Sequence, residues 1–199
     1  MFGSQELIEW LIKAGIKGGI LPSAKKVAKH YLEKCNHDKE EAIKTLIGWK
    51  TAHAATTGFT TGVGGFAALP AQIPSSIGAS YLISTNTIAS IAEIKGYNSD
   101  KEEVRTLILM CLVANSAEIF LKDFGIRVGK KFSEKALYQI SGKVLIEINK
   151  KVGFRLITKA GEKGAVNLIK FIPLAGGVVG ATIDSNFVKA SGEIAKKKL

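Results

Sequence analysis

Residues 51–92 read TAHAATTGFTTGVGGFAALPAQIPSSIGASYLISTNTIASIA and contain no Asp, Glu, Lys or Arg. Hydroxyl and amide side chains interrupt this stretch throughout, so it lacks the continuous apolar run of an ordinary membrane-spanning helix. It is also too poor in charge for an ordinary surface segment. We therefore expect it to be buried, either inside the protein or in the edge of a lipid bilayer.

A shorter run of the same character, FIPLAGGVVGATI, occupies residues 171–183. Both runs combine glycine clusters with an apolar residue followed by proline, at Leu69-Pro70, Ile73-Pro74 and Ile172-Pro173. Glycine permits close approach of backbones, and proline bends or ends a helix. The two Gly/Pro-rich segments are thus expected to form bent helical hairpins in the interior of the fold.

The rest of the chain carries repeated signals for helices. Asp38 with Glu41, and Ser99 with Glu102, match the capping-box pattern at a helix start. Helices are also expected from Ser4 to near residues 15–19, after Pro22-Ser23, and over residues 186–198. The helix after Asp38 has four large apolar residues, which are Ile43, Leu46, Ile47 and Trp49, and the helix after Ser99 includes Cys111. Alternation typical of strands is missing, so we predict one compact all-α domain over residues 1–199.

Charge is concentrated in the C-terminal part of the chain. The net charge is +11, of which residues 1–121 contribute +1 (12 Lys and Arg, 11 Asp and Glu) and residues 122–199 contribute +10 (16 and 6). Arg155, Lys159 and Lys163 recur every four residues and would form one stripe on a helix, with Lys170 farther along. These four residues are the candidates for binding an anion.

A structural interpretation of the same stripe remains open. Glu118 lies in an otherwise apolar helical segment, and Asp184 follows the second Gly-rich run. A buried carboxylate needs a cationic or hydrogen-bonding partner, so the stripe could close ion pairs with these two acids instead of meeting an external anion.

Motifs for cofactors and metals are weak. Residues 62–67 read GVGGFA, but no strand precedes them and no acid follows at the spacing of a dinucleotide site. His30, Cys35 and His37 match no familiar metal-ligand spacing. We predict no cofactor or metal site. Nucleic-acid binding is disfavoured because aromatic residues, 8% of the chain, do not alternate with the basic stripe as a base-stacking surface would.

Three blocks in fixed order resemble the EcsC family. They are TTGFTTGVGGFAALPAQIP (residues 56–74), IAEIKGYNSD (91–100) and INKKVGFRLITKAGEKGAVNLIKFIPLAGGVVGATID (148–184), with a Cys111-Leu112 step between the last two. The resemblance is strongest over residues 48–190. The family is named for a protein encoded beside a bacterial ABC transporter linked to secretion. The resemblance implies a bacterial accessory protein close to the membrane, and it supplies no catalytic residues.

Two functions follow as expectations. The first is an accessory protein, linked to an ABC transporter or to secretion, whose basic C-terminal half binds an anionic membrane surface or a membrane-protein partner. The alternative is a hydrolase acting on a lipid or peptide, with Glu118, Asp184 or His53 in its site, so whether the protein is an enzyme stays open. The first residues show no secretory signal, and two cysteines suggest no disulfide framework. We expect a cytoplasmic location, peripheral to the inner membrane.

Overall fold

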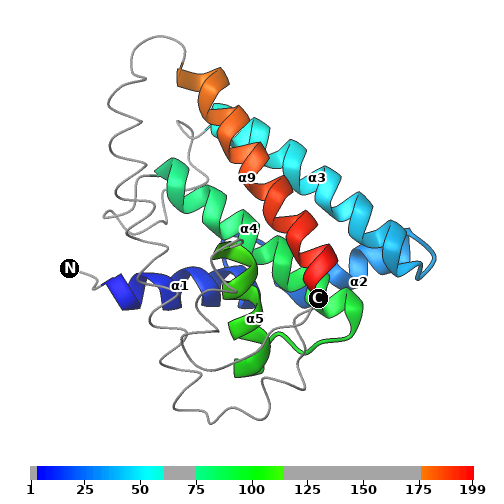
Figure 1. Ribbon diagram of the computed structural model, residues 1–199. Coiled ribbons are helices and arrows are strands. Elements are labelled where there is room, and N and C mark those ends of the chain that lie inside the picture. The colour runs from blue at the N-terminus through cyan, green and yellow to red at the C-terminus, as the bar shows by residue number, and fades with distance from the viewer. Residues whose placement is uncertain (1–3, 61–74, 114–175) are drawn as a thin grey trace.

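A computed structural model describes residues 4–60, 75–113 and 176–199, and this part of the chain forms six helices without a strand. The helices are α1 (Ser4–Lys17), α2 (Ala24–Lys34), α3 (Lys39–Thr60), α4 (Ser75–Lys95), α5 (Glu102–Val113) and α9 (Gly176–Lys198). The predicted all-α fold is confirmed. Helices α3 and α9 run side by side in opposite directions, as Figure 1 shows.

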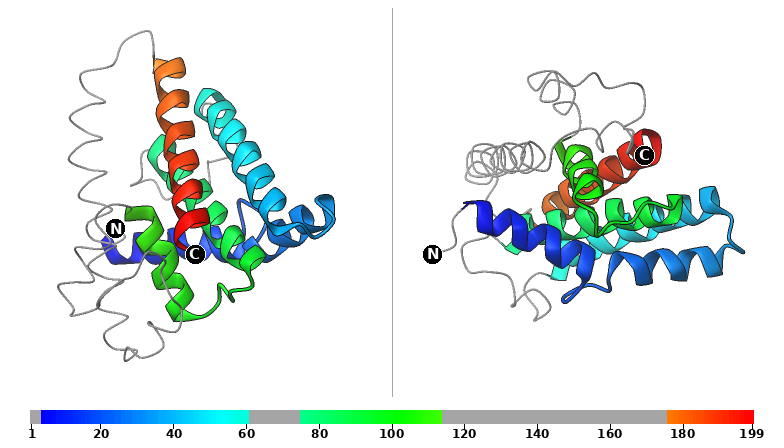
Figure 2. Two further views of the ribbon diagram at one scale, coloured as in Figure 1. Left: turned by 45° about the vertical axis from the view of Figure 1, so that its right-hand side comes forward. Right: turned by 90° about the horizontal axis from the view of Figure 1, so that it is seen from below.

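Helix α4 is the central element of this arrangement. It contacts each of the other five described helices (Figure 2). Residues 82–92 are all buried, so three successive turns of α4 meet protein on every side. This surrounding explains why residues 82–92 carry no charge and show no amphipathic period: the helix has no solvent-facing side on which to place charges.

Three hydroxyl groups on α4 form hydrogen bonds within the helix, whereas the buried Ser84 hydroxyl has no hydrogen-bond partner in the described part of the chain. Thr85 donates to the Tyr81 carbonyl (2.8 Å), Thr87 donates to the Ile83 carbonyl (2.7 Å), and Ser90 donates to the Asn86 carbonyl (2.7 Å). These bonds to the preceding turn let small polar residues be buried without an external partner. The serines and threonines that distinguish residues 75–92 from a membrane span are therefore compatible with a protein interior.

Asn86 differs from these hydroxyls because its side chain reaches three other segments. Its Nδ2 donates to the Gly15 carbonyl of α1 (2.7 Å) and to the Pro22 carbonyl (2.9 Å) before α2. Its Oδ1 accepts from Lys50 Nζ of α3 (2.7 Å). The side chain is fully buried. One amide therefore joins α1, the entrance to α2, α3 and α4.

Helix α1 lies unusually close to α4 where Asn86 binds it. A Cβ atom built on Gly15 would lie 2.6 Å from Thr85 Cγ2, which is inside the contact distance. Glycine at this position lets the α1 backbone come within hydrogen-bonding distance of Asn86. The helix then ends at Lys17, and Gly18 follows with φ +93°.

Two helix starts expected from the sequence, at Ser23 and Asp38, are present. Ser23 accepts from the Lys26 N–H (3.4 Å) at the start of α2, and Asp38 Oδ1 accepts from the Glu41 N–H (3.0 Å) before α3. The expected capping box of Ser99 and Glu102 is not formed, because α5 begins at Glu102 and the Ser99 hydroxyl donates to Glu93 Oε1 (2.6 Å). Cys111 is fully buried in α5 as predicted, and burial raises its thiol pKa to about 12.

Two details differ from the expectations. Ile43, Leu46 and Ile47 of α3 are buried, but Trp49 is 59% exposed, so it does not belong to the apolar face of that helix. Helix α9 begins at Gly176, ten residues before the expected start, so residues 176–183 are its first turns. Residues 61–74 and 171–175, which contain the three prolines of the two runs, lie outside the described residues.

Replacing Asn86 by alanine should destabilise the fold strongly. The change leaves the buried Gly15 carbonyl, the Pro22 carbonyl and the Lys50 ammonium without their partner, and loss of a buried partner costs about 1–3 kcal/mol. We expect a decrease of about 3 kcal/mol or more in the free energy of unfolding, measured by urea denaturation.

Ser90→Ala is the matched control on the same helix. It removes only a hydroxyl bonded to its own helix, and we expect a loss below about 1 kcal/mol. Equal losses for the two variants would contradict a bridging role of Asn86.

Candidate functional site

The residues predicted to bind an anion are not placed by the structure. Arg155, Lys159, Lys163 and Lys170 lie outside the described residues, as does Glu118. Asp184 lies on α9, but the position of its side chain is not described. The proposed pairing of the two acids with the basic stripe therefore stays a prediction.

His53 is the one proposed hydrolase residue whose side chain is described. It is exposed on α3, one turn after Lys50. Desolvation and the charge of Lys50 hold the pKa of His53 below its usual value. The imidazole is therefore mostly neutral at neutral pH.

Lys50 is a half-buried amine in a polar part of the interior. Within the described part of the chain its Nζ contacts the Asn86 amide and no carboxylate. Desolvation therefore lowers its pKa to about 8. Asn86 supplies a neutral acceptor, which satisfies one N–H of the ammonium without neutralising its charge.

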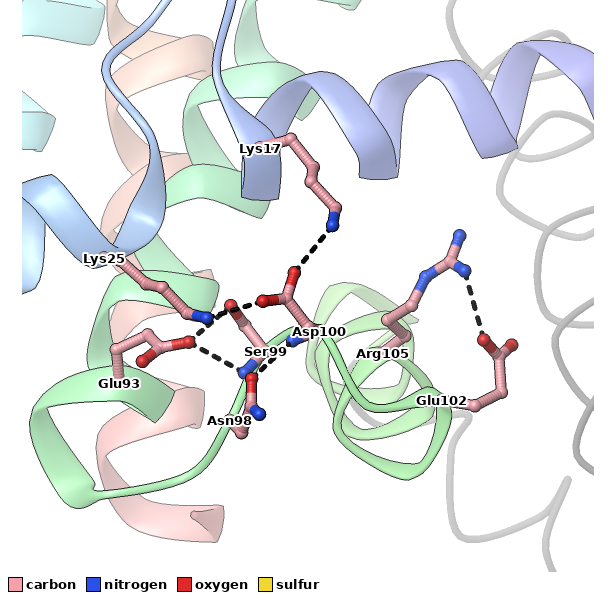
Figure 3. Close-up of polar contacts among 8 residues, drawn as sticks. All are labelled: Lys17, Lys25, Glu93, Asn98, Ser99, Asp100, Glu102 and Arg105. Carbon is pink, nitrogen blue, oxygen red and sulfur yellow. Dashed lines mark hydrogen bonds and ion pairs between the residues drawn. The ribbon is translucent and has the colours of Figure 1, made fainter.

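A cluster of ion pairs joins α1, α2 and the turn before α5 (Figure 3). The Asp100 carboxylate meets Lys17 Nζ at 2.9 Å through one oxygen and Lys25 Nζ through the other. The hydrogen bond from Lys25, followed by the one from Lys17, lowers the pKa of Asp100 to about 2. Asp100 consequently stays ionised at any physiological pH.

The turn between α4 and α5 positions Asp100. Gly96 has φ +97° directly after α4 ends. Glu93 Oε1 then accepts from both the backbone N–H (2.8 Å) and the hydroxyl (2.6 Å) of Ser99, while the Asn98 side chain accepts from the Asp100 N–H (3.0 Å). These bonds fix the residue before Asp100 to α4, so the carboxylate is presented to α1 and α2 by a rigid turn (Figure 3).

Beside this cluster lies an open cavity of about 510 Å³. Its walls come from α1 on one side and from the α4–α5 turn with the first turn of α5 on the other. The lining residues are Glu9, Trp10, Lys13, Ile16, Lys17, Ser99, Asp100 and Arg105. Its volume falls in the range of small-molecule sites, and the lining combines apolar with convergent charged groups.

A second feature, which we call the Trp49 surface, consists of Lys26, His30, Lys34 and Trp49. The first three residues recur every four positions and form one exposed row along α2. Lys34 Nζ lies 5.5 Å from the centre of the Trp49 ring, within the range of a cation–π contact. Trp49 is the one large apolar side chain that is exposed among the described residues.

The sequence contained a signal for the Trp49 surface but none for the cavity. Helix α2 (AKKVAKHYLEK) has four lysines and one acid in eleven residues, and Trp49 is one of two tryptophans in the chain. The cavity joins residues some ninety positions apart, on α1 and around Asp100, so only tertiary packing brings its walls together.

Comparison with known proteins places the chain in a family. The EcsC protein family model matches residues 4–199, so the chain belongs to the EcsC family. The chain is 26% identical over 201 residues to "Uncharacterized protein YdbA" of Bacillus subtilis (strain 168), an alignment that covers 91% of this chain and 70% of that protein. No solved structure matches.

The described part of the chain contains neither a membrane-spanning helix nor a metal-binding cluster. None of the helices in residues 4–60, 75–113 and 176–199 is long and apolar enough to cross a membrane. Within those ranges no group of three or more His, Cys, Asp or Glu side chains is arranged to hold a metal ion.

The shifted pKa of Lys50 predicts a measurable pH dependence. The Lys50 amine has its ordinary pKa of 10.5 in the unfolded chain and a pKa of about 8 in the folded protein. Between these values the unfolded state binds more protons, so this group makes stability rise with pH. We expect the free energy of unfolding of the wild type, relative to that of Lys50→Met, to rise by about 2 kcal/mol between about pH 7 and pH 10. Urea denaturation at each pH measures it. A pH-independent difference would show that the amine titrates normally.

Proposed function

We propose that this EcsC-family protein works as an accessory protein at the cytoplasmic face of the membrane, where it binds an anionic lipid surface. The Trp49 surface is the observation that carries the proposal. Membership of the family and its resemblance to a protein encoded beside an ABC transporter support a role linked to transport or secretion.

The charge and shape of α2 fit a flat anionic partner. Ala24, Val27 and Ala28 are buried on one side of the helix, while Lys26 and Lys29 are exposed on the other. Each lysine near an anionic leaflet contributes about 1 kcal/mol of attraction. Several lysines on one short helix therefore give weak, salt-sensitive binding.

Trp49 supplies the apolar contribution that such binding needs. Tryptophan is enriched at membrane–water interfaces because its ring is apolar and its N–H is polar. On α3 the exposed neighbours of Trp49 include Gly48 and Ala52, which carry no charge. The adjacent Lys50 directs its amine into the interior, toward Asn86, so insertion of the ring would not require that amine to enter the lipid.

The hydrolase alternative gains no support from the described residues. His53 lies on the exposed side of α3, and the positions of the Glu118 and Asp184 side chains are not described. The surface-binding function is therefore the one that the described geometry favours.

Vesicle sedimentation tests the proposal. Wild-type protein should pellet with phosphatidylglycerol vesicles at low salt and stay in solution with phosphatidylcholine vesicles, because the attraction is electrostatic. Lys26→Glu reverses one charge and should weaken binding roughly tenfold or more. Trp49→Ala should weaken binding at low and at high salt, because it removes the apolar contact.

Lys189→Glu is the matched control. Lys189 is exposed on α9, and it forms no ion pair within the described part of the chain. This variant has the same net charge as Lys26→Glu and should bind nearly as well as the wild type. Folded wild-type protein that ignores anionic vesicles would refute the function, and equal binding by all variants would refute the role of the Trp49 surface.

A further inference from the structure

We propose that the cavity between α1 and the start of α5 is a binding site for a small organic phosphate that carries an apolar part. The phosphate would meet Lys13, Lys17 and Arg105, and the apolar part would lie against Trp10 and Ile16. This site is separate from the Trp49 surface, which α2 and α3 form, and it does not depend on that surface.

The cations of the cavity have binding capacity to spare. Lys13 is exposed and takes part in no ion pair within the described ranges. Arg105 uses Nη1 for Glu102 at 3.1 Å, while a guanidinium has five N–H donors. Phosphate, with several acceptor oxygens, suits a pair of cations that approach from two elements. Figure 3 shows Arg105 and Lys17 extending from opposite walls.

The ion pairs around Asp100 keep the carboxylate in the cavity from repelling an anion. Asp100 is in contact with two ammonium groups, Lys17 and Lys25. Its negative charge is thus offset locally, and a bound phosphate would share Lys17 with it. Glu9 is the remaining acid of the lining, it is exposed, and it forms no ion pair with a described residue.

The apolar lining indicates that the ligand is more than inorganic phosphate. Trp10 is half-buried and Ile16 is buried, and both line the cavity together with the aliphatic parts of the lysine side chains. A volume of about 510 Å³ is far larger than one phosphate group needs. A phosphorylated metabolite and a phospholipid head group share this chemistry.

Fluorescence of Trp10 provides a direct assay. The chain has two tryptophans, so Trp49→Phe leaves Trp10 as the single reporter and also removes the proposed membrane anchor. We would titrate this protein with glycerol 3-phosphate and with dihexanoyl phosphatidic acid, a lipid that is soluble as a monomer. Saturable binding with a Kd of about 1 mM or below is expected for at least one of them.

Two substitutions that each remove one charge should act in opposite directions. Lys13→Gln should raise the Kd about tenfold because it removes a charge-assisted hydrogen bond. Glu9→Gln should lower the Kd severalfold because it removes a nearby negative charge. Lys189→Gln, on α9, should leave the Kd unchanged. A structural effect of substitution would not produce shifts of opposite sign.

The outcomes separate the two ligand sources. Binding of the phosphatidic acid alone would support the site with a lipid head group as its ligand. Equal binding of both probes would support a soluble phosphate as the ligand and would refute the contact of an apolar part with Trp10 and Ile16. No fluorescence change with either probe, or the same Kd in the Lys13 and Glu9 variants, would overturn the proposal. These results do not test vesicle binding through the Trp49 surface, because that binding is measured with protein that retains Trp49.

Discussion

The hydrogen bonds of the Asn86 side chain are the interaction on which the described structure depends. Helix α4 is buried on every side over residues 82–92, so its contacts must be apolar or satisfied internally. Thr85, Thr87 and Ser90 meet this requirement within the helix, but Asn86 meets it by binding α1, the entrance to α2, and α3. The polar atoms that would be costly to bury alone thus fix the positions of the helices around α4.

The same requirement explains why an amine is tolerated beside α4. Asn86 uses both N–H groups on backbone carbonyls, so its oxygen remains to accept from Lys50. The amide oxygen brings no negative charge to offset burial, and desolvation lowers the pKa of Lys50 to about 8. Lys50 thus satisfies the buried amide oxygen of Asn86, while its own ammonium is partly desolvated, which is unfavourable.

The sequence predicted the helical class and the main helix starts because those depend on local chemistry. Ser23 and Asp38 cap helices through atoms three residues away. The burial of residues 82–92 was predicted from their lack of charge.

The role of Asn86 was not predicted, because its hydrogen-bond partners lie 36 to 71 residues away in the sequence. Trp49 was grouped with the apolar residues of its helix, and its exposure was not predicted because hydrophobicity alone does not determine exposure. The cavity was not predicted either, because the residues of its two walls are far apart in the sequence.

Helix α2 illustrates how one short helix can serve several partners. Lys25 and Lys34 are nine residues apart, about two and a half turns, and therefore point to opposite sides. Lys25 binds Asp100, whereas Lys34 covers the Trp49 ring. Lys34 also ends the exposed row that begins with Lys26. The high lysine content of α2 thus has two separate causes. One flank neutralises a carboxylate that the rigid turn after α4 presents, and the other flank and the exposed row leave positive charge beside an exposed indole. A uniformly solvated basic helix would need neither the fixed position of Asp100 nor the exposure of Trp49.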